Sequence, residues 1–186
     1  MNQPEDEIKK QLAHDEKLLW LGQPRQGVFL RGSDAFMIPF SFLWGGFAFF
    51  WEFSVIDSNA PAFFMLWGIP FVLVGTYIII GRFFVEAAQR ARTIYAVTNE
   101  RIIIISGMLG RKTRSINLRT LSDFSLTEGR GTEGTITLGG GLSANSLFGG
   151  FSGWPGMDAR MGPRFELIPE AKKVYEIIRS SQRAAS

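Results

Sequence analysis

The fold is decided by two uncharged stretches, AFMIPFSFLWGGFAFFW (Ala35–Trp51) and SNAPAFFMLWGIPFVLVGTYIIIG (Ser58–Gly81). A bilayer core roughly 30 Å thick is crossed by about 20 apolar residues of α-helix, at about 1.5 Å of rise per residue. The second stretch is long enough by itself, and the first becomes long enough by continuing past Glu52 to Ile56. The two stretches therefore predict a transmembrane helical hairpin over residues 34–84.

Basic residues are placed asymmetrically around this hairpin. Arginines occur before the first helix and after the second, whereas the turn at 57–61 contains neither Lys nor Arg. These arginines are Arg25, Arg31, Arg82, Arg90 and Arg92. Because Lys and Arg are enriched in cytoplasmic loops, we expect both termini inside and the turn outside, in the cytoplasmic (inner) membrane. Residues 1–33 then form a cytoplasmic N-terminal segment, and residues 85–92 a juxtamembrane linker.

Small residues and one acid interrupt the apolar stretches. Gly45, Gly46 and Gly75 are expected to let the two helix backbones approach closely. Glu52 lies about one turn from the outer end of the first helix, where we expect its carboxylate to reach headgroups or water. An ion pathway would need a partner charge within the membrane, so packing of a two-helix anchor is the simpler interpretation.

The composition excludes several kinds of chemistry. The chain has 186 residues, no cysteine and one histidine, so disulfides and thiolate nucleophiles are excluded, and neither a metal site nor a cofactor is expected. The acidic residues of the second half are scattered among turn residues without a Ser-His pairing, so we do not expect an enzyme. Residues 82–186 hold fifteen Lys and Arg against nine Asp and Glu, an excess common in domains that face anionic lipid. The basic residues follow no recognisable nucleic-acid-binding motif, so nucleic acid is not an expected partner.

After the hairpin the pattern changes to short β-type segments. The predicted strands are Thr93–Val97, Arg101–Ser106, Arg111–Leu118, Leu121–Leu126, Thr135–Leu138 and Phe165–Ile168. Pro169 then begins a helix with apolar residues at the i, i+3, i+4, i+7 spacing of a core-facing stripe. Strands followed by one closing helix indicate an α+β domain over 93–182, an antiparallel sheet or partial barrel capped by a C-terminal helix, with 183–186 as a tail. The segment Glu5–Leu19 is expected to form a short amphipathic helix.

The run IYAVTNERIII (Ile94–Ile104) resembles the Y-x-(V/L)-T-(N/D)-x-R-(I/L) signature of bacterial pleckstrin-homology-like (PH-like) domains. The block LWLGQP (Leu19–Pro24) resembles the W-x-G-x-P that often opens such chains, and FELIPEAKKVY (Phe165–Tyr175) resembles their F-x-x-I-x-x-A-x-x-V-Y ending. Many members of the group carry a membrane hairpin just before the domain. The resemblance covers most of residues 15–180, and it implies a barrel-like sheet capped by a helix and used for binding rather than catalysis.

Three cations fall within four residues, at Arg111, Lys112 and Arg114. Arginine can bind phosphate oxygens through two parallel hydrogen bonds, and lysine binds them as a point charge. These three residues are therefore candidate lipid-binding residues. Three interpretations stay open: a solvated hairpin, general contact with anionic lipid, and a defined headgroup site.

Large apolar side chains also occur in the glycine-rich loop 139–163. The candidate partner-binding residues there are Leu147, Phe148, Phe151 and Trp154. These side chains either fold back on the sheet edge, insert into the membrane interface, or form a protein-binding patch.

Together these features predict a membrane-tethered, non-catalytic PH-like module for binding or scaffolding. Its expected partners are membrane proteins, cytoplasmic proteins or an anionic lipid surface, and the tether would raise the effective concentration of weak contacts. The alternative is a small transporter or channel subunit built on the hairpin. Because two spans enclose a pore only by oligomerising, a homo-oligomer stays open.

Overall fold

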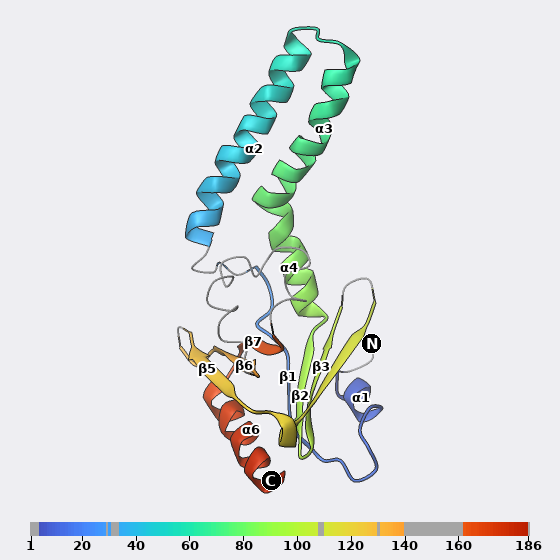
Figure 1. Ribbon diagram of the computed structural model, residues 1–186, viewed down its shortest axis with the longest axis vertical. Coiled ribbons are helices and arrows are strands. Elements are labelled where there is room, and N and C mark those ends of the chain that lie inside the picture. Colours follow the sequence, from blue (N-terminus) through green and yellow to red (C-terminus); the bar gives the residue numbers. More distant parts are fainter. Residues whose placement is uncertain are drawn as a thin grey trace. The chain divides into compact units, whose positions relative to one another are not determined.

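The computed structural model describes residues 4–28, 30, 34–107, 110–129, 131–139 and 162–185. Within this part, the chain forms two compact units. The hairpin unit consists of the described residues between 28 and 86, and the sheet unit combines residues 4–27, 87–139 and 162–185 with their gaps. The sheet unit is therefore built from chain on both sides of the hairpin, which is inserted between the first and second strands (Figure 1).

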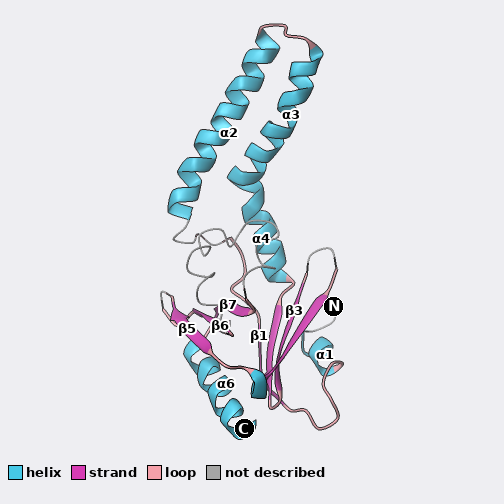
Figure 2. Cartoon of the chain, in the orientation of Figure 1, coloured by secondary structure: helices cyan, strands magenta, loops and turns pink. Residues whose placement is uncertain are grey.

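The hairpin unit is built on two long helical segments joined by a tight turn (Figure 2). The outgoing segment is α2 (Asp34–Asp57). The returning segment consists of α3 (Ala62–Thr76), a π-helical turn η1 (Tyr77–Gly81) and α4 (Arg82–Ala91), which follow one another without a break. By length and composition alone, Met37–Asp57 and Ala62–Ala91 are long and apolar enough to cross a membrane.

Two glycines bring the helices of the hairpin unit close together. A Cβ added to Gly75 would lie 3.1 Å from the Cα of Gly45, and a Cβ added to Gly45 would collide with the side chain of Ile79. The prediction of close backbone approach is therefore confirmed for Gly45 and Gly75. It is wrong for Gly46, where an added Cβ would meet no atom of another described segment within 4 Å.

The acid inside α2 points toward α3. A Cβ added to Gly68 would collide with the Glu52 carboxylate, so this side chain packs directly on the glycine. Its Oε2 atom is buried and has no hydrogen-bond partner in the described part of the chain. The expectation that Glu52 reaches headgroups or water is corrected for this oxygen, which faces the neighbouring helix because the glycine leaves room for it.

An ion pair joins the open ends of the two helical segments. Arg82 Nη2 lies 2.8 Å from Asp34 Oδ1, and the two side chains are only 9% and 8% exposed. Asp34 is the first residue of α2, where the helix dipole also favours a negative charge. The Arg82 guanidinium lies 4.4 Å from the centre of the Phe83 ring, within the range of a cation–π contact.

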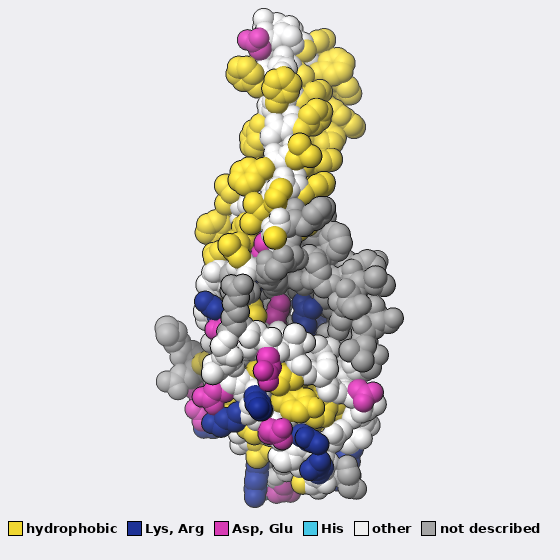
Figure 3. Space-filling view, turned by 90° about the vertical axis from the view of Figure 1, so that its left-hand side faces the viewer, with side chains coloured by type: hydrophobic (Ala, Val, Ile, Leu, Met, Phe, Trp, Pro, Cys, Tyr) yellow, Lys and Arg dark blue, Asp and Glu magenta, His cyan; other side chains and the backbone are white. Residues whose placement is uncertain are grey.

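The rest of the hairpin surface is strongly apolar. Figure 3 shows hydrophobic side chains covering this unit on the face in view. Among them, Leu43, Phe50 and Phe53 are 74%, 70% and 69% exposed. A contiguous apolar surface of this kind marks a region that meets lipid or another protein.

The sheet unit begins with a four-stranded antiparallel sheet in the order β1-β2-β3-β4. Its strands are β1 (Leu18–Gly22), β2 (Ile94–Thr98), β3 (Arg101–Ser106) and β4 (Lys112–Asn117). The side chains of β2 and the inner residues of β3 are buried on both faces of the sheet, which explains why their sequences are nearly continuous apolar runs. The sequence predicts β2, β3 and β4 to within one residue at either end.

The first strand corrects the expectation for the N-terminal segment. The helix expected over Glu5–Leu19 is limited to α1 (Pro4–Lys9), and the chain then enters β1. Trp20 pairs with Val97 and Leu21 with Ala96 in the antiparallel ladder. Pairing with the buried strand β2 stabilises the extended conformation here, so tertiary contacts override the local helical pattern.

A second antiparallel sheet has the order β5-β6-β7. Its strands are β5 (Phe124–Glu128), β6 (Gly134–Leu138) and β7 (Arg164–Ile168). A short 3₁₀ turn, η2 (Leu118–Thr120), follows β4, and the predicted strand at Leu121–Leu126 accordingly starts three residues late. The C-terminal helix α6 is Ala171–Ala185. It begins two residues later than the expected start at Pro169.

Two clusters of buried side chains occupy opposite faces of the first sheet. The larger one joins β2 and β3 to the second sheet and to the stripe Ala171, Val174 and Ile178 of α6. The smaller one is centred on Ile8 of α1, which is fully buried against the other face. This arrangement of antiparallel sheets closed by a C-terminal helix confirms the predicted α+β class.

Candidate functional site

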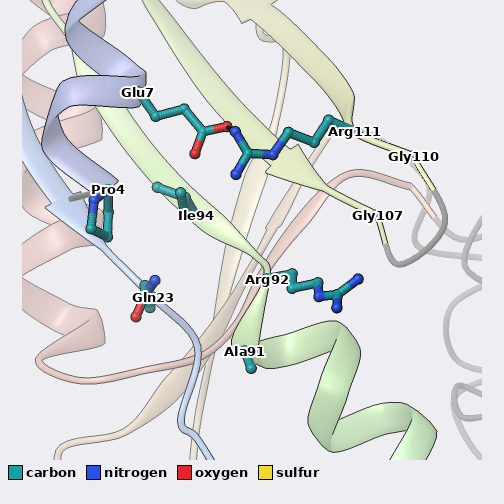
Figure 4. Close-up of a pocket in the computed structure, with 9 residues that line it drawn as sticks. All are labelled: Pro4, Glu7, Gln23, Ala91, Arg92, Ile94, Gly107, Gly110 and Arg111. Carbon is teal, nitrogen blue, oxygen red and sulfur yellow. Dashed lines mark hydrogen bonds and ion pairs between the residues drawn. The ribbon is translucent and has the colours of Figure 1, made fainter. Parts of the chain in front are cut away.

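The sheet unit has a pocket of about 400 Å³ on the α1 side of the first sheet. Segments far apart in the sequence meet there: α1, the end of β1, the start of β2 and the β3–β4 connection (Figure 4). Its lining residues are Pro4, Glu7, Gln23, Ala91, Arg92, Ile94, Gly107, Gly110 and Arg111. A volume of this size lies within the range of small-ligand sites.

A charged pair spans one side of the pocket. In Figure 4 the carboxylate of Glu7 and the guanidinium of Arg111 point toward each other, and Arg111 Nη1 forms an ion pair with Glu7 Oε1. The Glu7 side chain is 12% exposed, whereas that of Arg111 is 69% exposed. Arg92 lines the same pocket, so two arginines and one carboxylate determine its charge.

The structure separates the three candidate lipid-binding residues. Side chains alternate between the two faces of a strand, and the Thr113 hydroxyl accepts a hydrogen bond from Gln11 on the α1 side. Arg111 and Thr113 therefore face α1, whereas Lys112 and Arg114 project from the opposite face of β4. Lys112 and Arg114 are both exposed. Only Arg111 of the three lines the pocket.

The residues of the signature motif have a structural role. Glu16, whose side chain is fully buried, accepts hydrogen bonds from Arg101 Nε and Nη2 at 2.8 Å each. The Thr98 hydroxyl donates at 2.7 Å to Oε1, the oxygen that also accepts from Arg101 Nε. Asn99 exchanges two hydrogen bonds with the backbone of Lys17. The motif Thr98-Asn99-Glu100-Arg101 thus fastens the segment before β1 to the β2–β3 turn. Glu16 also accepts a hydrogen bond from the backbone N–H of Ala13. We call the contacts of Glu16 with Arg101, Thr98 and Ala13 the Glu16 network.

The charge of Glu16 is stabilised by this network. Burial raises the pKa of its carboxyl, but hydrogen bonds from Arg101, from the backbone N–H of Ala13 and from Thr98, together with the charge of Arg101, bring the pKa down to about 2. The same hydrogen bond from Arg101 to Glu16 raises the pKa of the guanidinium above its ordinary value. Both groups are therefore charged at neutral pH.

Three aromatic residues of the motifs that carry the family resemblance also pack in the core. The Tyr95 ring stacks on Phe165 with ring centres 4.6 Å apart, and Trp20 packs on the same ring at 5.6 Å. A Cβ at Gly22 would collide with the Trp20 indole, so only glycine leaves room for this side chain. The motif residues thus fix the fold and leave the pocket to other side chains.

The family model described as "Bacterial PH domain" matches residues 53–182, more than half of the chain. The chain belongs to the bacterial PH domain family. This confirms the resemblance drawn from the sequence. Searches of curated proteins and of solved structures found no match.

The bacterial PH domain match begins within α2 and leaves the N-terminal segment outside. Arg92 and Arg111 of the pocket lie within the matched range, whereas Pro4, Glu7 and Gln23 precede it. The pocket of this bacterial PH domain protein is therefore completed by residues that its family model does not cover.

The structure leaves one set of predicted site residues untested and adds two residues that were not predicted. Leu147, Phe148, Phe151 and Trp154, the candidate partner-binding residues, lie outside the described residues. Sequence reasoning missed Glu7 and Glu16, which come to the sheet from more than 80 residues away. The acidic run at Glu5–Glu7 was a visible signal for the first, but no local pattern marks Glu16. Within the described ranges, no group of three or more His, Cys, Asp or Glu side chains could hold a metal ion.

Proposed function

We propose that this bacterial PH domain protein is a membrane-tethered, non-catalytic binding module. The hairpin unit anchors it in the cytoplasmic membrane with both termini in the cytoplasm. The sheet unit binds anionic lipid headgroups or membrane and cytoplasmic proteins close to the bilayer.

The observation that carries the tether is the outward-facing apolar surface of α2 and α3. Aromatic and aliphatic side chains such as Leu43, Phe50 and Phe53 are more than two-thirds exposed. Burial of apolar area contributes roughly 25 cal/mol per Å², so leaving this surface in water is costly and transferring it to lipid is favourable. The candidate spans of 21 and 30 residues match what a bilayer core requires.

Charge supports the cytoplasmic placement of the sheet unit. Arg82, Arg90 and Arg92 follow the second apolar stretch, and the turn between the helices has no Lys or Arg. Exposed basic residues on β4, Lys112 and Arg114, add to the positive charge that an anionic leaflet attracts by about 1 kcal/mol per residue. Residues 147–154 provide a further proposed contact for protein partners.

A non-catalytic role is supported by the known side-chain chemistry of the chain. The sequence offers no cysteine, one histidine and no Ser-His pairing, and the residues that the family motif singles out are used for structure. A tethered domain needs only modest intrinsic affinity, because the anchor confines it to a thin layer next to its ligands.

The tether and its orientation can be tested by extraction and labelling of the full chain in its native membrane. Carbonate washing at alkaline pH should leave the protein in the membrane pellet. Because the natural chain has no cysteine, the variants Ser58→Cys and Ser180→Cys each report one site. A membrane-impermeant maleimide should label the first from outside and the second only after permeabilisation.

Other outcomes would overturn the proposal. Release of the protein by carbonate would exclude the anchor, and labelling of Ser180→Cys from outside would exclude the orientation. Ion or solute flux in proteoliposomes would instead support the oligomeric transporter or channel subunit.

A further inference from the structure

The contact between Glu7 and Arg111 places an anion on an exposed arginine of the pocket. The Arg111 guanidinium is 69% exposed, so its remaining N–H groups are accessible from solvent. A carboxylate and a phosphate group both present paired oxygens to which arginine binds through two parallel hydrogen bonds. Glu7 therefore occupies the position that an anionic ligand of the pocket would take.

The position of Glu7 does not depend on this ion pair. The next residue, Ile8, is fully buried among Ile94, Ala96, Ile103 and Ile105, and this packing fixes α1 on the sheet. In the pair itself, the Arg111 guanidinium faces solvent, whereas the Glu7 carboxylate is mostly shielded from it. A ligand can therefore reach Arg111 from solvent, and one with more negative charge than a carboxylate can displace Glu7 from the guanidinium.

The other lining residues suit a small phosphorylated group. Arg92 supplies a second positive charge in the same pocket, and Gln23 supplies an amide. Gly107 and Gly110 line the pocket next to Arg111 and contribute only backbone atoms to it. The volume of about 400 Å³ accommodates a group the size of glycerol phosphate.

We propose that this pocket binds a phosphate group at Arg111 and that Glu7 competes with the ligand for the same guanidinium. The phosphate belongs either to a lipid headgroup or to a soluble phosphorylated molecule. The inference rests on the proposed binding role of the sheet unit, but it does not require the membrane tether.

The test uses the full chain in neutral detergent micelles, so that its outcome is independent of membrane anchoring. One arm titrates sn-glycerol 3-phosphate by calorimetry, with glycerol as the uncharged control. The other arm titrates micelles doped with dioctanoyl phosphatidic acid, with dioctanoyl phosphatidylcholine as the control. Binding in the first arm identifies a soluble source of the phosphate group, and binding in the second arm alone identifies a lipid source.

The variants distinguish competition from a general charge effect. Glu7→Gln should bind about 2- to 5-fold tighter than the natural chain, because its competitor is gone. Arg111→Gln should bind about 10-fold weaker or worse, because a charge-assisted hydrogen bond is lost. Glu5→Gln removes an equal charge from an exposed residue of α1 that pairs with Lys9, and it should leave binding unchanged.

The double variant decides whether Glu7 acts through Arg111. Glu7→Gln combined with Arg111→Gln should bind as weakly as Arg111→Gln alone. If Arg111→Gln does not fold, Arg111→Lys keeps the charge but not the two-pronged geometry, and it should weaken binding by a smaller factor. Equal effects of Glu7→Gln and Glu5→Gln, or no phosphate binding in either arm, would overturn the inference while leaving the membrane proposal intact.

Discussion

Two acid–arginine pairs connect the N-terminal segment to the first sheet, and they differ in almost every physical respect. Glu16 is fully buried and accepts hydrogen bonds from Arg101, Thr98 and the backbone of Ala13. Glu7 reaches Arg111, whose side chain is mostly exposed. The first pair lies in the turn that defines the family motif, and the second lies at the rim of a pocket.

The difference separates a structural ion pair from an exchangeable one. A buried carboxylate that loses its cation is left uncompensated, so the Glu16 network has to remain intact in the folded protein. A pair at the surface competes with water and salt, so its partners can separate at little cost. The same two residue types thus stabilise the fold in one place and offer a binding group in the other.

The largest expected effect comes from removing the cation of the buried pair. Arg101→Met leaves the Glu16 carboxylate without its partner charge, and we expect a loss of about 3 to 5 kcal/mol in the free energy of unfolding. Thermal unfolding of the full chain in detergent, followed by circular dichroism, measures it. Arg114→Met, at an exposed position of the next strand, is the matched control and should change stability by less than about 0.5 kcal/mol. Similar losses for both variants would mean that Arg101 contributes no more to the free energy of unfolding than an exposed arginine does.

The second effect is a dependence of stability on acid. The pKa of Glu16 is lowered from its ordinary value of 4.5 to about 2. Because the folded-state pKa is the lower one, the stabilisation is fully present above about pH 4.5 and is lost as the pH falls through 2. It amounts to about 3 kcal/mol at most.

Unfolding midpoints measured between pH 7 and pH 2 test this dependence. The advantage of the natural chain over Glu16→Gln should shrink below pH 4.5. Parallel profiles for the natural chain and Glu16→Gln would refute the assignment of charge to Glu16.

A third pair, in the hairpin unit, gives an intermediate case. Asp34 and Arg82 are nearly buried and lie at the open end of the hairpin. Water near the helix ends can hydrate the two charges if they separate, which lowers the cost of breaking the pair. Polar contacts between helices in bilayers are worth about 1 kcal/mol, so Asp34→Asn should lower helix stability by that order. Loss of helical circular dichroism on heating in micelles measures it, with Ser54→Ala, an exposed polar residue of α2, as the control. A loss of stability as large as that of Arg101→Met would mean that the pair of Asp34 and Arg82 is structural, like that of Glu16 and Arg101.

The smallest expected effect on stability belongs to the exposed pair. Glu7→Gln should change the free energy of unfolding by less than about 0.5 kcal/mol, because Ile8 holds α1 in place and the pair is screened. Unfolding at high salt should make this small difference smaller still, because salt screens an exposed pair. A loss above 2 kcal/mol would make Glu7 a structural residue and remove the contrast between the two pairs.

Sequence periodicity was sufficient for most of the sheet unit and insufficient for its N-terminal part. The apolar runs of β2 and β3 and the stripe of α6 carry their own local signal, and the structure places them where they were expected. The strand β1 has no such signal, because its extended conformation depends on pairing with residues more than 70 positions later. Glu7 and Glu16 could not be assigned for the same reason, since their partners come from distant segments.

The faces to which the basic residues point could have been predicted from the sequence. Arg111, Lys112 and Arg114 were treated as one cluster, but alternation along a strand directs Arg111 to one face and the other two to the opposite face. The period of two was available in the sequence once a strand was predicted there. The pocket could not be predicted in this way, because it is formed by four separate segments of the chain.

Insertion of the hairpin between β1 and β2 has a consequence for synthesis of the protein. The ribosome completes β1 roughly 70 residues before β2 exists, so at about 5 to 20 residues per second the first strand waits for several seconds without a neighbour. The two apolar helices are synthesised during this interval, while the first sheet is still incomplete. Closure of that sheet is therefore a late event, which can begin only after the returning helix has been made.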